Sequence, residues 1–337
     1  HEPSHKASAD GTHSGDSDAA AKGSKRRRRG GKARADQAPW SVEDFPVDPK
    51  EGETRFHDLG LRDELMHAIA DLGFEYCSAI QASILPHTLQ GNDAIGKAQT
   101  GTGKTAAFLI TIFNDMLCNP LEGERFVGEP RALVIAPTRE LVMQIAQDAT
   151  DLARHTELQV VTLIGGMDYQ KQLNRLHNNV VDLVVATPGR LLDFMSRRDL
   201  YLDHIETLVL DEADRMLDMG FIPQVKRIVR ATPRKEDRQT LLFSATFTQD
   251  IINLSAQWTY EPVTIEIEPD HVATDSVDQK VYLVSSEQRY RVLNNLLRSE
   301  GASSVIVFAN RRDQVRRLHE RLRKSGVAAG ILSGEIP

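Results

Sequence analysis

The sequence predicts a doubly wound α/β fold, in which helices cover both faces of a parallel sheet. Short apolar runs rich in Val, Ile and Leu alternate with segments of helical periodicity, as expected of buried parallel strands joined by helices. A glycine-rich loop and a pair of adjacent carboxylates stand at the turns where an open α/β sheet binds its ligands. The expected strands are residues 132–136, 159–164, 181–185, 207–210 and 240–243, and the helices between them include 139–155 and 223–230.

The composition is that of a globular protein larger than one ordinary domain. The chain has 337 residues, of which 40% are hydrophobic, so two domains with sizeable cores are expected. The sequence contains no apolar run long enough to cross a membrane, and we expect no membrane partner. Cys77 and Cys118 form neither a metal-binding spacing nor a disulfide framework, which favours a cytoplasmic protein.

Residues 1–52 have few large apolar side chains and a dense run of Lys and Arg at 22–34. Such a segment cannot bury enough surface to offset the entropy of ordering it, so we expect a disordered basic tail. Its positive charge either contacts RNA phosphates or only keeps the tail in solution.

The strand and helix pattern divides the rest of the chain into two parts. Residues 53–268 form the first expected domain, and the pattern is lost over 262–278, where we place a linker at 269–278. A second series then occupies 279–337 and stops after half of a comparable pattern, so we expect an incomplete second domain within a longer protein. Its expected strands are 279–284, 305–309 and 330–332, with helices at 287–299 and 311–325.

The loop at residues 98–105 has the composition of a phosphate-binding loop. Small residues let successive backbone N–H groups face a phosphate, and the following helix directs its positive end to the same point. Lys104 then reaches the outer phosphates, and the Thr105 hydroxyl can hold Mg²⁺. The loop opens with Ala98 in place of the more general Gly. The alternative is a simple glycine-rich turn between a strand and a helix.

Asp211 and Glu212 directly follow the apolar run 207–210. Asp211 suits the acid that holds Mg²⁺ beside a phosphate loop, and Glu212 suits a base that deprotonates an attacking water. This pair indicates hydrolysis of a terminal phosphate. The alternative is an acidic helix start that is stabilised by the helix dipole.

Residues 211–214 read Asp-Glu-Ala-Asp, and here the chain resembles the DEAD-box RNA helicases of superfamily 2. The other motifs of that family follow in order, at residues 73–81, 98–105, 137–141, 165–166, 187–190, 244–246 and 305–310. The resemblance covers nearly all of the chain from Phe56 onward and implies two RecA-like domains. Cys77 and the stretches 214–221 and 305–310 are most similar to one bacterial subgroup of the family.

The resemblance implies that the glycine-rich loop binds ATP with Mg²⁺. Gln81 has both a donor and an acceptor, which suits the N6/N7 edge of adenine. Phe56 either packs beside the adenine or pins the N-terminal segment to the core; we favour the first. The expected ATP-binding residues are Phe56, Phe74, Gln81, Ala98, Gln99, Thr100, Gly101, Thr102, Gly103, Lys104 and Thr105. The expected catalytic residues are Lys104, Asp211 and Glu212, with Thr105 and Asp211 as the Mg²⁺ ligands.

Three turns are expected to hold the RNA backbone, and a fourth to couple hydrolysis to strand separation. Backbone N–H groups and Arg side chains at helix starts suit phosphates without reading bases. Helix capping by Thr138 and Thr187, or an internal ion pair of Arg139, would explain the same residues. The expected RNA-binding residues are Pro137, Thr138, Arg139, Gly165, Gly166, Thr187, Pro188, Gly189 and Arg190. The expected coupling residues are Asp214, Ser244 and Thr246, and a plain polar turn is the alternative for the last two.

The predicted function is therefore an ATP-dependent RNA helicase that opens short duplexes in bacterial RNA turnover. The alternatives are an RNA clamp that uses ATP only to lock onto RNA, and a DNA helicase. The resemblance to the bacterial subgroup implies a partner in an endoribonuclease-based degradation complex. Because the family's later motifs are not in the sequence, we expect this chain by itself to hydrolyse ATP poorly.

Overall fold

The computed structural model describes residues 40–99, 101–267, 278, 280–299 and 304–332. It divides into two compact units, the first ending at Ile267 and the second beginning at Glu268. The predicted linker at 269–278 lies outside the described residues except for Asp278. No helix in the described ranges is long and apolar enough to span a membrane.

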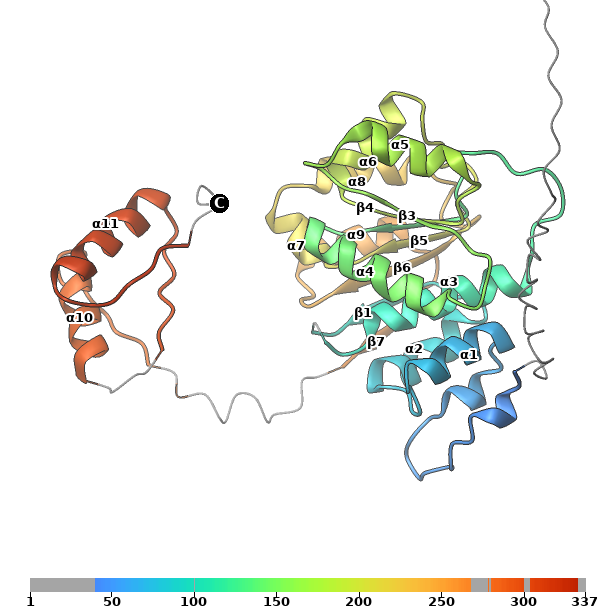
Figure 1. Cartoon of the computed structure of the whole chain (residues 1–337), viewed down its shortest axis with the longest axis horizontal. Coiled ribbons are helices and arrows are strands. Elements are labelled where there is room, and N and C mark those ends of the chain that lie inside the picture. Colours follow the sequence, from blue (N-terminus) through green and yellow to red (C-terminus); the bar gives the residue numbers. More distant parts are fainter. Residues whose placement is uncertain (1–39, 100, 268–277, 279, 300–303, 333–337) are drawn as a thin grey trace, which may run out of the picture. The chain divides into compact units, whose positions relative to one another are not determined.

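The first unit is built on one parallel sheet of seven strands in the order β3-β4-β2-β5-β6-β1-β7 (Figure 1). All paired strands run parallel, and the register places Leu210 beside Ile135 on one side and Leu242 on the other. The strands are β1 (Ala94–Lys97), β2 (Ala132–Ile135), β3 (Val160–Leu163), β4 (Leu183–Ala186), β5 (Thr207–Leu210), β6 (Gln239–Ser244) and β7 (Val263–Glu266).

Helices cover both faces of this sheet, so the predicted doubly wound α/β fold of the RecA-like type is confirmed. One face packs on α1 (Asp63–Asp71), α2 (Ala79–Thr88), α3 (Lys104–Cys118) and α4 (Arg139–Leu152). The other packs on α5 (Tyr169–Asn178), α6 (Pro188–Ser196), α7 (Ala213–Asp218), α8 (Ile222–Val229) and α9 (Gln249–Trp258).

The two cores follow from the alternation of side chains along each strand. In β2, Ala132 and Val134 belong to the first core, whereas Leu133 and Ile135 belong to the second. A strand that is apolar on both faces reads as a continuous hydrophobic run. This is why the sequence alone located β2 to β6 within one or two residues.

The strand β7 corrects the sequence prediction, because residues 262–278 were expected to lose the fold's pattern. Val263–Glu266 pairs with β1 in parallel, with Val263 beside Ala94. It is an edge strand whose burial alternates, with Val263 and Ile265 against the core and Thr264 and Glu266 exposed. Its short alternating pattern lacks the continuous apolar run of the inner strands.

The prediction of a disordered tail over residues 1–52 is wrong for 40–52, and residues 1–39 lie outside the described chain. A short 3-10 helix, Val42–Asp44, is followed by a segment held to the domain. The Arg55 guanidinium donates to the Val47 carbonyl at 2.8 Å, and the Tyr76 hydroxyl donates to the Asp48 carbonyl at 2.7 Å. Trp40 stacks on His67 with ring centroids 4.6 Å apart. These few anchors stabilise a segment whose average composition is polar.

The second unit contains α10 (Arg289–Ser299) and α11 (Arg312–Lys324). The Tyr290 hydroxyl of α10 donates to the Arg321 carbonyl of α11 at 2.9 Å, which ties the two helices together. The predicted strands at 279–284, 305–309 and 330–332 do not form within its described residues. Leu283 and Phe308 are 96% and 90% exposed. An apolar β-branched run becomes a strand only where a partner completes its hydrogen-bond ladder.

Candidate active site

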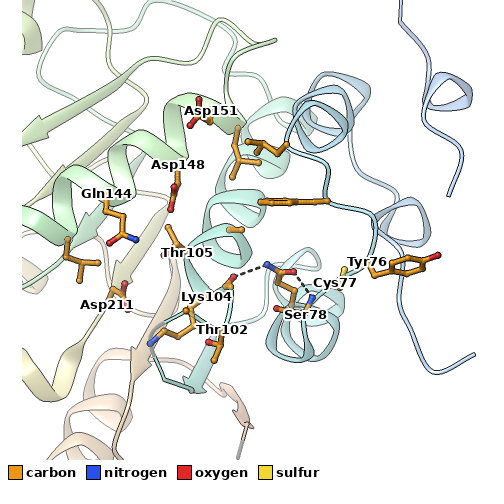
Figure 2. A pocket seen from close by; sticks show the side chains of 18 of the residues that line it. Tyr76, Cys77, Ser78, Thr102, Lys104, Thr105, Gln144, Asp148, Asp151 and Asp211 are labelled. Carbon is orange, nitrogen blue, oxygen red and sulfur yellow. Dashed lines mark hydrogen bonds between the residues drawn. The ribbon is translucent and has the colours of Figure 1, made fainter. Parts of the chain in front are cut away.

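A cavity of about 680 Å³ opens at the carboxyl edge of the sheet, between the start of α3, the loop before α2, and α4. It brings together residues predicted from three separate parts of the sequence. Figure 2 shows Lys104 and Thr105 at the start of α3, with Asp211 from the end of β5 nearby. The predicted residues that line it are Phe74, Gln81, Gly101, Thr102, Gly103, Lys104, Thr105, Asp211 and Glu212.

The glycine-rich loop joins β1 to α3. Ala98 extends the pairing of β1 with β6, since its N–H donates to the Ser244 carbonyl at 3.2 Å. Thr102 closes the turn by donating its hydroxyl to the Gln99 carbonyl at 2.9 Å. Ala98 and Gln99 do not themselves line the cavity, so they shape the loop, and Thr100 lies outside the described residues.

Two features of position 103 require glycine: its backbone conformation and the lack of room for a side chain. Its φ of +94° lies in the left-handed region, and a Cβ there would be 2.6 Å from Gln81 Nε2. This close approach lets Gln81 support the loop. Its Nε2 donates to the Gly103 carbonyl at 3.0 Å, and its Oε1 accepts from the Ser78 N–H at 2.8 Å.

The Gln81 side chain is 6% exposed and retains one N–H and one lone pair beyond these two bonds. Its first role in the structure is therefore to connect the loop before α2 with the phosphate loop. An adenine contact would use the remaining donor and acceptor.

Lys104 is 6% exposed, and its ammonium group donates to the Ala98 carbonyl at 2.7 Å. The amine thus folds back across the loop that it belongs to. A buried ammonium group needs such a partner, and an incoming phosphate oxygen is a charged alternative to this carbonyl.

The two aromatic residues predicted for ATP occupy different positions. Phe74 lines the cavity. Phe56 is 1% exposed and does not line it, but stacks on Phe74 with ring centroids 6.3 Å apart. The expectation that Phe56 packs beside adenine is therefore corrected: this ring supports Phe74 from behind and pins the N-terminal segment to the core.

The acid pair combines burial with backbone strain. Asp211 is 3% exposed, and desolvation raises the pKa of its carboxyl group to about 6, although the charge of Lys104 acts in the opposite direction. Glu212 has a φ of +51°, an uncommon conformation for a residue with a side chain. The Arg215 guanidinium donates to Glu212 Oε2 at 3.1 Å and holds that carboxylate at the cavity.

These residues fit a Mg²⁺ ion by their chemistry. The Thr105 hydroxyl and the Asp211 carboxylate are hard oxygen donors that line one cavity. A buried carboxyl group whose ionised form is disfavoured by desolvation is stabilised in that form by a nearby cation.

The predicted coupling residues also meet. The Thr246 N–H and hydroxyl both donate to Asp214 Oδ2, at 3.0 and 3.1 Å. Ser244 is fully buried at the end of β6, and its hydroxyl donates to the Thr246 carbonyl at 2.8 Å. Because β6 lies between β5 and β1, this turn stands between the acid pair and the phosphate loop.

The predicted RNA-binding turns follow β2, β3 and β4, which are neighbours in the sheet. They therefore lie side by side along the same carboxyl edge. The Arg139 guanidinium, from the turn after β2, lies beside Gly166 in the turn after β3. A Cβ added to Gly166 would be only 2.7 Å from Arg139 Nη1. Thr138 caps α4 by accepting from the Leu141 N–H at 3.2 Å.

The other residues at this edge have mainly structural contacts in this structure. Thr187 precedes α6 without a side-chain cap bond, and Pro188 is buried in the first turn, whereas Gly165 and Gly189 have open space where a Cβ would stand. Arg190 donates to the Met167 carbonyl at 3.1 Å and is 12% exposed. Its Nε and Nη1 are buried without a hydrogen-bond partner.

The sequence prediction missed the wall of the cavity that α4 provides. Gln144, Asp148 and Asp151 line the cavity from this helix (Figure 2). Burial raises the pKa of the Asp148 carboxyl group, and the neighbouring charge of Asp151 adds to this effect. Their spacing along residues 139–152 places them on one helix face, but a polar stripe alone does not distinguish a cavity wall from a solvated surface.

The fold and the site define a P-loop nucleotide-binding domain with an acid pair beside the phosphate loop. The chain belongs to the DEAD/DEAH box helicase family, which it matches over residues 78–254. The predicted family is thus confirmed.

Curated relatives extend the similarity beyond that region. The chain is 59% identical over 291 residues to the ATP-dependent RNA helicase RhlB of Pseudomonas aeruginosa, covering 86% of this chain and 73% of the relative. It is 40% identical over 283 residues to RhlB of Shewanella baltica, covering 84% and 64%. The bacterial subgroup that the residues around Cys77 indicate is accordingly the RhlB type.

A solved structure supports the fold independently. The crystal structure of a DEAD box protein from the hyperthermophile Methanococcus jannaschii is 32% identical, with a TM-score of 0.58 over 85% of this chain and 74% of that one.

Proposed function

We propose that this chain acts as an ATP-dependent RNA helicase, which uses RNA-stimulated ATP hydrolysis to separate short RNA duplexes. The observation that carries the proposal is one cavity lined by Gln81, the phosphate loop and the acid pair. This cavity lies at the same sheet edge as the three turns suited to an RNA backbone.

ATP binding would use contacts that the loop already makes internally. The Lys104 ammonium would exchange the neutral Ala98 carbonyl for an oxygen of the outer phosphates, whose negative charge makes it the stronger acceptor. Gln81 would keep its bond to the Gly103 carbonyl and offer its free donor and acceptor to the adenine edge. That arrangement favours ATP over GTP.

Hydrolysis would be assisted by Glu212. Its carboxylate would accept a proton from the attacking water, whose oxygen forms a bond to the γ-phosphorus. The bond from that phosphorus to the β–γ bridging oxygen would break, and ADP would leave with the electron pair. The bond from Arg215 holds the carboxylate in place without using both of its oxygens.

Mg²⁺ would be held by Thr105 and Asp211, and when bound it would neutralise charge on the phosphates. Asp211 must be ionised for this role, and its position beside the Lys104 charge favours that form.

RNA would lie along the turns after β2, β4 and β3. Arg139, Gly165, Gly166, Gly189 and the start of α6 offer a guanidinium group and backbone N–H groups to phosphates, so binding would not depend on sequence. Thr246 would pass the state of the nucleotide to this edge through its two bonds to Asp214.

We also propose that the protein works in the cytoplasm and joins an endoribonuclease-based complex of RNA turnover. The support is its similarity to the RhlB type. Co-purification of an endoribonuclease with the tagged protein from bacterial extract, resistant to RNase treatment, is the expected result.

A strand-displacement assay tests the helicase function. A short RNA duplex with a single-stranded extension should be separated with ATP and much less with GTP, at a low rate because this chain by itself is expected to hydrolyse ATP poorly. Separation that requires a bound nucleotide but proceeds equally with a nonhydrolysable ATP analogue would support an RNA clamp instead. Equal activity on a DNA duplex would contradict the assignment to RNA.

A further inference from the structure

Two histidines and one aspartate form a cluster outside the nucleotide cavity. His67 and Asp71 are one helical turn apart on α1, and His155 follows α4. One donor atom from each side chain lies within 4.8 Å of the others. Among the residues that the structure describes, no other group of three His, Cys, Asp or Glu side chains converges in this way.

We propose that His67, Asp71 and His155 bind a divalent transition metal ion such as Zn²⁺. Two imidazole nitrogens and one carboxylate oxygen are donors typical of Zn²⁺, Co²⁺ and Ni²⁺, whereas Mg²⁺ and Ca²⁺ prefer oxygen alone. The Asp71 and His155 side chains are 36% and 29% exposed. An ion can therefore enter from solvent and keep a water as its fourth ligand.

The spacing of the donor atoms is close to that of a tetrahedral site, although the rings must turn to share one ion. In a tetrahedral site with bonds of about 2.0–2.1 Å, neighbouring donor atoms are roughly 3.3 Å apart. His155 Nε2 and Asp71 Oδ2 are 2.7 Å apart and share a hydrogen bond, and no pair of donors is separated by more than 4.8 Å. The metal would replace this hydrogen bond.

The rings of the cluster form a stack that would respond to the ion. His67 and His155 are parallel within 2°, with centroids 3.5 Å apart, and Trp40 covers the other side of His67 at 4.6 Å. Parallel imidazoles direct their in-plane lone pairs along parallel lines. In a tetrahedral site these lone pairs meet at about 109°, so the two rings must leave their parallel stack to share one metal. This rearrangement changes the environment of the Trp40 indole.

Arg154 is the cation that competes for the site. Its Nη1 lies 3.4 Å from Asp71 Oδ2, while its Nη2 donates to Asp151 Oδ1 at 2.8 Å. The ion would displace the longer contact, and Arg154 would keep the shorter one. Arg154→Gln removes the competing charge and should tighten metal binding.

Titration with Co²⁺ tests the proposal, because Co²⁺ reports through its own absorption and quenches nearby indole emission. His1, His5 and His13, which lie outside the described residues, are first changed together to Asn so that they cannot bind the ion. We expect one equivalent to bind saturably and quench Trp40. Trp258, buried at the far end of α9, is the reference when Trp40→Phe is titrated.

His67→Phe and His155→Phe keep a flat ring in the stack but remove a ligand, and each should weaken Co²⁺ binding by about tenfold or more. His204→Gln is the matched control, since that side chain is 65% exposed and belongs to no convergent group of three such ligands among the described residues. Absence of saturable binding overturns the proposal. Unchanged affinity in both Phe variants, with the fold intact by circular dichroism, overturns it equally.

Discussion

Asp211 shows a conflict between folding and function at a single carboxyl group. The side chain is buried at 3% exposure, and desolvation raises its pKa from 3.8 to about 6. The proposed role nevertheless requires the ionised form at neutral pH. Without a bound cation, this ionised carboxylate lowers the stability of the folded state.

Asp211→Asn should therefore stabilise the nucleotide-free protein at high pH. Between pH 3.8 and about 6 the folded state binds the extra proton, so wild-type stability falls as pH rises through this range and then levels off. The free energy of unfolding of the variant should exceed that of wild type by about 3 kcal/mol above pH 6, and this difference should vanish toward pH 4.

Urea unfolding at pH 4.5 and pH 8 measures this difference. A variant that is no more stable than wild type at pH 8 would show that Asp211 is already compensated within the protein. The same variant should lose Mg²⁺-dependent ATP binding, which separates the stability effect from the proposed function.

At the residue scale, the sequence predicts which residues enter the cavity better than what each one contacts. The phosphate loop, Gln81 and the acid pair are recognisable because their spacing follows the turns of an α/β sheet. The left-handed φ of Glu212 and the burial of Phe56 behind Phe74 arise from tertiary packing, which leaves no local pattern.

At the scale of elements, the turn after β6 connects the acid pair to the rest of the edge. Thr246 contacts Asp214 through both its N–H and its hydroxyl group. Two bonds to one carboxylate oxygen fix the orientation of α7 relative to the end of β6. We expect these bonds to transmit a movement of either element to the other.

Thr246→Val should uncouple hydrolysis from duplex separation. The variant keeps the shape and the N–H bond but loses the hydroxyl bond, worth about 1 kcal/mol. We expect RNA-stimulated ATP hydrolysis within about twofold of wild type and duplex separation per ATP reduced roughly fivefold.

Parallel measurements of phosphate release and strand displacement test this expectation. Thr248→Val is the control, because the Thr248 hydroxyl caps α9 by accepting from the Ile251 N–H, whereas Asp214 accepts its side-chain bond from Thr246. The Thr248→Val substitution should lower the free energy of unfolding by about 1 kcal/mol and leave the number of duplexes separated per ATP unchanged. Equal losses of both activities in Thr246→Val would argue against a coupling role.

The predictability of an element depends on how it is buried. Strands β2, β4, β5 and β6 are buried on both faces and were predicted. The edge strand β3 was also predicted, because three of its four residues are apolar, whereas β7 alternates apolar with polar residues and was missed. Residues 40–52 were predicted to be disordered because their stability comes from single anchors such as Trp40 and Val47. The average composition of a segment does not reveal single anchoring residues of this kind.

At the scale of the first unit, the strand order separates the two proposed binding sites along one edge. The turns after β3, β4 and β2 carry the proposed RNA contacts, and those after β5, β6 and β1 carry the nucleotide site. The two groups meet between β2 and β5. Sequence order alone interleaves them, so only the sheet topology reveals this division.

Arg139→Gln should weaken RNA binding without changing ATP binding. Loss of one phosphate contact lowers the slope of log K against log salt by about 0.7 for single-stranded RNA. The expected loss of affinity is about fivefold to tenfold at low salt, equally for different sequences.

Fluorescence anisotropy over a range of KCl concentrations measures both quantities. Arg234→Gln is the matched control, since that side chain is 80% exposed in the loop before β6, at the opposite edge of the sheet. Unchanged affinity and slope in Arg139→Gln would mean that the position of Arg139 beside Gly166 is only structural.

The second unit marks the limit of the sequence prediction for the whole chain. Both of its helices were predicted, because an amphipathic helix satisfies its own backbone hydrogen bonds. Its strands were predicted from apolar runs alone, and no ladder forms among the described residues. A strand is a property of a pair of segments, and one segment cannot specify it.

The central claim is that Glu212 activates water for ATP hydrolysis under the control of RNA. Glu212→Gln preserves the size of the side chain and its position beside Arg215 but removes the base. Phosphate release with saturating RNA should fall by about 10²-fold or more, while ATP binding stays within a few-fold of wild type. Phosphate release by the variant at the wild-type rate, or a wild-type rate that RNA does not change, would contradict the claim.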